Sequence, residues 1–158
     1  MDAQALVGQL MAAKEWFDRS SRCLTEADSP TAPSEGLFTA AQQVAHVAQI
    51  VDWFTEGAFR PEGFDMDFET MTGEVLKVES LEKAREWLDR SFENAAGVIV
   101  SKSMEELSVP LPEGPVLGGM PRLAIVNALC DHTAHHRGAL TVYSRLCGHT
   151  PAMPYMET

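Results

Sequence analysis

Positive charge is scarce in this sequence of 158 residues, which has 12 lysines and arginines against 23 aspartates and glutamates. The formal net charge is −11, and no cluster of basic residues interrupts the acidic balance. Nucleic-acid binding needs cationic side chains that displace counterions from phosphates, and binding to anionic membranes needs basic patches. The sequence therefore predicts neither a nucleic acid nor a membrane as partner.

Long apolar runs and paired cysteines are also lacking. No run of apolar residues approaches the ~20 that a helix needs to span a bilayer. The first residues, MDAQALVGQLMAAKEW, have neither the basic segment nor the cleavage site of a signal peptide. The three cysteines, Cys23, Cys130 and Cys147, match no zinc-ribbon or CxxC spacing. We expect a cytoplasmic protein with reduced thiols.

What the sequence does have is helical periodicity throughout. Apolar residues recur three and four positions apart, alternating β patterns are absent, and no repeat or second domain appears. We expect one all-α domain with helices over residues 3–25, 39–57, 80–101 and 121–146. Residues 58–79 are expected to form a long crossover between helices two and three, with one short helical turn at most. Four helices joined in this way predict a four-helix bundle.

Local signals set the expected helix ends. Leu24 continues the apolar stripe of the first helix. Thr39 followed by Gln42 has the spacing of a capping box, and Ser80 is a favourable N-cap. Pro121 suits the first turn of the last helix, and Gly57 and Gly148 are expected C-terminal stops.

Three histidines are expected to face the core. A helix turns ~100° per residue, so His136 lies ~40° from His132 around the last helix, and Tyr143 lies ~20° from it. In the second helix, His46 shares a face with Ile50 and Trp53. A buried imidazole needs partners for its donor and its acceptor, and a divalent metal can accept one lone pair from each ring. Isolated core histidines are more often simply hydrogen-bonded, so the pattern by itself also permits a bundle that holds no metal.

The run DHTAHHRGALTVYSRLCGHTP (residues 131–151) resembles the C-terminal signature of the DinB-like, damage-inducible superfamily, whose members show an HxxxHHRGQ-type stretch there. The run AAQQVAHVAQIVDWF resembles the superfamily's second helix. The resemblance covers essentially the whole chain. It implies a metal-binding four-helix bundle in which His46, His132 and His136 are the ligands.

The same resemblance assigns roles to neighbouring residues. His135 matches a position that is usually not a ligand, and we expect it to support the site from the edge of the core face. Ala139 stands where the signature often has glutamine. His149 lies beyond the helix and is expected to be a solvated tail residue. Zn²⁺ and Ni²⁺ both suit neutral imidazoles. Relatives often form homodimers, and we expect one here, because the apolar residues opposite His46 (Ala41, Ala48 and Val51) leave apolar surface to cover.

Relatives with assigned activity include S-transferases that use bacillithiol or mycothiol, and a mycothiol-dependent isomerase. The resemblance thus implies a small-molecule substrate, a low-molecular-weight thiol as cosubstrate and a metal-activated thiolate or water, in a transferase or a hydrolase. Tyr143 is the one candidate catalytic residue, as a hydrogen-bond donor into the pocket, and an ordinary core aromatic is the other interpretation. The sequence shows no general base, so a non-catalytic metal-binding or stress-response interaction module remains the alternative.

Further polar residues have open roles at this stage. Gln42 and Gln49 are expected either to orient substrate and ligands or to be solvated. Arg137, at ~140° from His132, is expected to pair with an acidic residue of another helix or subunit. Cys130, at ~160°, is expected to be a small buried residue and not a ligand.

Overall fold

Helices form nearly all of the regular structure in the computed structural model, which describes residues 2–156. Four are long: α1 (Ala3–Ser21), α2 (Ala40–Phe59), α4 (Leu81–Val100) and α6 (Ala124–Leu146). The shorter elements are the 3-10 helix η1 (Glu26–Asp28) and the helices α3 (Phe68–Leu76) and α5 (Met104–Ser108). Within residues 2–156 no strand forms, and Pro110 and Pro121 make an isolated bridge. The prediction of an all-α protein is confirmed.

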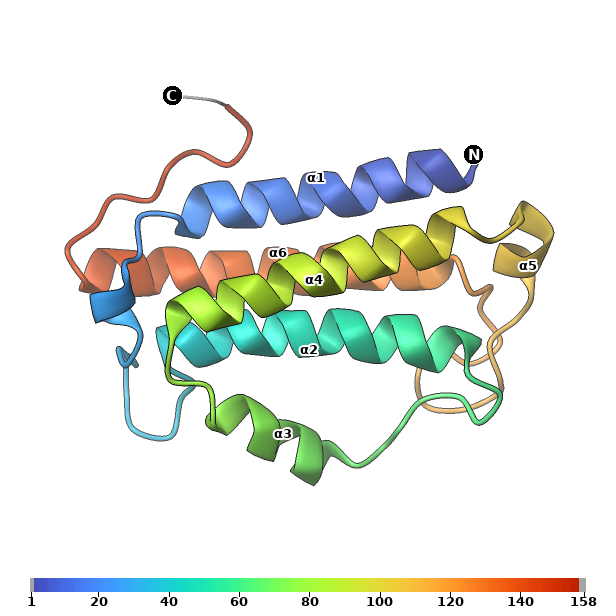
Figure 1. The fold of residues 1–158 in the computed structure, drawn as a ribbon, viewed down its shortest axis with the longest axis horizontal. Coiled ribbons are helices and arrows are strands. Elements are labelled where there is room, and N and C mark those ends of the chain that lie inside the picture. Colours follow the sequence, from blue (N-terminus) through green and yellow to red (C-terminus); the bar gives the residue numbers. More distant parts are fainter. Residues whose placement is uncertain (1, 157–158) are drawn as a thin grey trace.

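The long helices surround one core. Helix α2 packs against α4 and α6, and α1 packs against the same two helices. Figure 1 shows α1 and α6 running in one direction and α2 and α4 in the other. The connection from α2 to α4 leads back along α2, and it contains the nine-residue helix α3 where one turn at most was expected.

Several expected helix ends are confirmed. The Thr39 hydroxyl accepts from the Gln42 amide, and the Gln42 side chain accepts from the Thr39 amide, which completes the capping box of α2. The Ser80 hydroxyl accepts from the Lys83 amide at the start of α4. Gly148 follows α6 with a φ of 82°, a left-handed conformation that glycine adopts without steric cost.

Other helix ends lie two to four residues from the expected positions, within the margin of a prediction from sequence. Helix α1 stops at Ser21, because Thr25 has an extended backbone and begins η1 with its own capping box. Leu24 is buried but lies outside the helix. Pro121 precedes α6, because the amide of Arg122 donates to the carbonyl of Val109, which directly follows α5, and the amide of Leu123 donates to the carbonyl of Leu107 in α5.

Gly57 does not end α2, which continues to Phe59. Any side chain at this position would clash with the ring of Phe64, because even a Cβ at Gly57 would overlap Cδ1 of that ring. The glycine therefore lets the chain that follows α2 fold back closely onto the helix.

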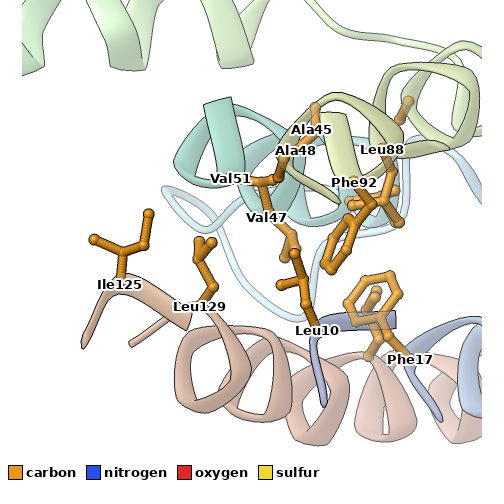
Figure 2. Close-up of a cluster of buried hydrophobic side chains, with 14 of the residues drawn as sticks. Leu10, Phe17, Ala45, Val47, Ala48, Val51, Leu88, Phe92, Ile125 and Leu129 are labelled. Carbon is orange, nitrogen blue, oxygen red and sulfur yellow. The ribbon is translucent and has the colours of Figure 1, made fainter. Parts of the chain in front are cut away.

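The core is a continuous cluster of side chains from all four long helices. Figure 2 labels several of them, including Leu10 and Phe17 of α1, Phe92 of α4 and Leu129 of α6. Ala41, Ala48 and Val51 of α2 are fully buried in this cluster. The argument from these three residues for a dimer is therefore wrong, because α4 and α6 already cover α2 within one chain.

Nowhere in the described residues is there a helix with the length and apolar character needed to cross a bilayer.

Candidate metal centre

The three predicted histidines come together between α2 and α6. His46 lies on α2, and His132 and His136 lie one turn apart on α6. The ring centroid of His46 is 5.1 Å from that of His132 and 4.9 Å from that of His136, and the two α6 rings are 4.4 Å apart. One ligand nitrogen from each ring lies within 4.8 Å of the others. The triad is therefore positioned to hold a metal ion.

The chemistry of the triad fits a divalent ion. Among the described residues, no carboxylate or thiol belongs to this group of possible ligands. No hydrogen bond to another described residue occupies the ring nitrogens of His46 or His132. The lone pairs of both rings are therefore free to bind a metal ion.

Burial and mutual repulsion keep the rings neutral. Burial, with added repulsion from His46, lowers the pKa of His132 to about 4. Burial, with added repulsion from His132 and His46, lowers the pKa of His136 to about 3. The pKa of His46 is lowered mainly by burial and also by His135. Neutral imidazole is the form that binds metal, so the site is prepared for a ligand role at neutral pH.

Gln43 was not identified from the sequence, yet it is the residue that orients His136. Nδ1 of His136 lies 2.6 Å from Oε1 of Gln43, and since a side-chain carbonyl can only accept, Nδ1 is the donor. This bond leaves Nε2 of His136 with the free lone pair. Such a bond to the other ring nitrogen fixes the tautomer of metal-ligating histidines. One feature of the sequence could have indicated this role. Gln43 precedes His46 by three residues on α2, which places the two side chains next to each other on the helix surface.

Tyr143 extends this chain of hydrogen bonds. Its hydroxyl donates to the Phe38 carbonyl at 2.7 Å and accepts from Nε2 of Gln43 at 3.3 Å. The ring is buried in the core, and burial raises the pKa of its hydroxyl. Its proton is therefore committed to a backbone carbonyl, and its contact with the site runs through Gln43.

The other two glutamines tie α3 to α2. The side-chain amide of Gln42 donates to the Leu76 carbonyl, and that of Gln49 donates to the Met71 carbonyl. Neither makes a hydrogen bond to the triad, so their bonds hold the crossover in place.

His135 and Ala139 lie beside the triad. The His135 ring is exposed, and its centroid is 4.9 Å from that of His136. Ala139 is half-buried and brings no polar group.

His149 is not the solvated residue we expected, because its Nε2 lies 2.9 Å from Oδ2 of Asp28. The Thr25 amide, with further donors including His149, lowers the pKa of Asp28 to about 2.

Two residues on the opposite side of α6 also have partners in α1. Arg137 finds no acidic residue in the described part of the chain; it donates to the Tyr155 hydroxyl and stacks against Trp16 and Tyr155. Cys130 is half-buried, lies 3.7 Å from the Gln9 carbonyl, and burial raises its pKa. As expected, it is not part of the triad.

Gln43→Ala is expected to weaken divalent-metal binding by about 10- to 100-fold, because His136 loses the acceptor that fixes its tautomer. Isothermal titration with Zn²⁺ and Ni²⁺ would measure this loss. Gln42→Ala is the matched control, since the side chain of this neighbour makes its hydrogen bonds to Thr39 and Leu76 and none to a triad histidine. Equal metal affinities in the two variants would show that the bond from His136 to Gln43 has no such role.

The metal-free protein is expected to lose stability as the pH falls from about 7 toward 4. An unfolded histidine binds a proton near pH 6.5, whereas His132 in the fold does so only near pH 4. Between these values the unfolded state binds more protons, so the free energy of unfolding falls with falling pH. Urea denaturation in chelator at several pH values would measure the slope. In His132→Leu the slope should be smaller, and an unchanged slope would exclude this histidine as a cause.

The comparisons with known proteins agree with this geometry. No match was found among curated proteins. The family model described as DinB family matches residues 7–158, which include all three histidines of the triad. The chain therefore belongs to the DinB family.

Proposed function

We propose that this chain is a single cytoplasmic domain, a four-helix bundle with its crossover between α2 and α4, that binds one divalent ion through His46, His132 and His136. The observation that carries the proposal is the convergence of three neutral imidazoles whose ligand nitrogens lie within 4.8 Å of one another. Zn²⁺ and Ni²⁺ are the proposed ions, because imidazole suits both. All three cysteines are free thiols, which is consistent with a reducing compartment.

We further propose a metal-dependent enzyme of the thiol S-transferase kind, with a hydrolase as a related possibility. A divalent ion with an open coordination position would lower the pKa of a bound thiol or water. In the transfer, the sulfur of a low-molecular-weight thiol forms a bond to an electrophilic carbon of the small-molecule substrate. The leaving group departs with its electron pair, and the thiol proton passes to solvent.

The residues around the triad would have supporting roles. Gln43 holds His136 through Nδ1, and Tyr143 holds Gln43. Phe38, whose ring centroid is 5.4 Å from that of His46, would limit the access of water on one side. The exposed ring of His135 would lie on the solvent side.

A non-catalytic metal-binding or interaction module is the second candidate. The favouring observation is that no carboxylate among the described residues joins the triad to act as a general base. A homodimer, which is common among relatives, remains a proposal that light scattering at micromolar concentration would test.

Elemental analysis followed by a conjugation assay tests these candidates in order. The purified chain, loaded with metal or treated with chelator, would be mixed with bacillithiol or mycothiol and the fluorogenic electrophile monochlorobimane. Metal-dependent conjugation that His136→Ala abolishes would support the transferase. Bound metal without conjugation by either thiol would favour the non-catalytic module. Absence of any bound metal after loading would overturn both.

A further inference from the structure

A second candidate site lies on the side of α6 that faces away from the triad. The groove between α1 and α6 has a volume of about 730 Å³, within the range of small-molecule pockets. Its lining extends over residues 5–16 of α1 and 127–137 of α6, a length of ~15 Å at ~1.5 Å per residue. No residue of the histidine triad lines it.

The floor of the groove is formed by small residues. Gly8 and Ala12 of α1 and Ala134 of α6 line it, so a ligand can approach the two helix backbones closely. A Cβ built at Gly8 meets no atom within 4 Å, which shows that there is free space above this glycine. An extended apolar chain of a ligand would fit against these small residues.

One end of the groove carries a positive charge. The Arg137 guanidinium lies 6.0 Å from the Trp16 ring centroid and 5.5 Å from that of Tyr155. These two rings meet edge to face at 5.1 Å, and Arg19 holds the adjoining Pro154 carbonyl at 2.9 Å. Pro154 and Tyr155 are thus fixed over this end of α1.

Arg137 has unused hydrogen-bonding capacity. In a chain with nearly twice as many acidic as basic residues, it pairs with no carboxylate in the described part of the sequence. Of the five N–H donors of a guanidinium, one bonds to the Tyr155 hydroxyl at 3.1 Å. A guanidinium held against aromatic rings can bind a carboxylate through two parallel hydrogen bonds.

We propose that the groove between α1 and α6 binds a small amphipathic carboxylate, with the acid group on Arg137 and the apolar chain over Gly8, Ala12 and Ala134. The charge of Arg137 selects an anion, and the small-residue floor selects an apolar body. This site is separate from the metal centre, and its ligand needs no metal.

Decanoate is the probe, used below the concentration at which it forms micelles, with decanol as its uncharged counterpart. Titration calorimetry in chelator, on wild type and on His136→Ala, keeps the metal centre out of the measurement. We expect decanoate to bind at least tenfold more tightly than decanol in both proteins. Arg137→Gln should remove this preference. Equal affinity of wild type for the two probes, or no binding of decanoate, would overturn the proposal.

A pair of glycine variants locates the ligand. Gly8→Leu fills the groove, whereas Gly97→Leu makes the same change in α4, where a Cβ also meets no atom within 4 Å. Both changes favour helix over glycine, so neither should lower the unfolding temperature. We expect Gly8→Leu to weaken decanoate binding at least tenfold and Gly97→Leu to leave it unchanged. Equal effects would contradict the assignment.

Cys130 offers a direct readout, because its thiol lines the groove whereas Cys23 and Cys147 do not. Decanoate should slow the alkylation of Cys130 by iodoacetamide without slowing that of Cys23 or Cys147, as measured by peptide mass spectrometry.

A different occupant of the groove is a second copy of the chain. If light scattering shows a wild-type dimer that Gly8→Leu converts to monomer, and decanoate does not protect Cys130, the groove is a subunit interface and the proposal is wrong.

Discussion

The His136→Ala variant should lose most of the stabilisation that a divalent ion gives to the wild-type chain. An ion that binds only the folded state, at about 1,000 times its dissociation constant, raises the free energy of unfolding by about 4 kcal/mol. His136 is the triad member whose geometry is fixed by a hydrogen bond, so its loss should weaken binding more than the loss of that bond alone. Thermal unfolding with added Zn²⁺ or Ni²⁺, compared with chelator, would measure the difference.

Two histidine variants serve as controls for this result. His135→Ala removes a neighbouring but exposed ring and should keep the metal-dependent rise in unfolding temperature. His149→Ala breaks the contact with Asp28, so it should lower the unfolding temperature of both forms and keep the difference between them. If His135→Ala abolished the metal effect while His136→Ala kept it, our choice of the α6 ligands would be wrong.

Phe92→Ala is expected to lower the free energy of unfolding by about 3–5 kcal/mol, because it opens a cavity in the packed core. The Phe92 ring of α4 is fully buried among side chains from the other long helices (Figure 2). Urea denaturation in chelator would measure the loss. Phe68→Ala makes the same change at a ring that is 48% exposed and contacts Trp53, and should cost no more than about 1.5 kcal/mol. Similar losses in the two variants would contradict the core described above.

Much of the local structure follows from the sequence by itself. The stripe of α4 (Leu81, Ala84, Leu88, Phe92, Ala95 and Ile99) is buried along its whole length, because apolar residues at helical spacing share one face. The capping box at Thr39 and the glycine after α6 depend on contacts within a few residues, so they too could be recognised without the fold. The same periodicity placed His132 and His136 on one face of α6.

Features that depend on contacts between segments distant in the sequence could not be predicted in this way. Helix α2 is covered on two sides by α4 and α6, so the residues opposite His46 are core and not surface, although their spacing is the same in either case. The start of α6 was decided by hydrogen bonds from Arg122 and Leu123 to Val109 and Leu107 at the C-terminal end of α5. The role of Gly57 was decided by the ring of Phe64.

The same distinction applies to the residues of the candidate site. The sequence, with its resemblance to a family, determined which three histidines to consider. Only the tertiary structure decided that Gln43, and neither Gln42 nor Gln49, bonds to His136, because three glutamines on one helix point in different directions toward different neighbours. It likewise decided that the Tyr143 hydroxyl is held by the Phe38 carbonyl, since this bond joins two segments that are far apart in the chain.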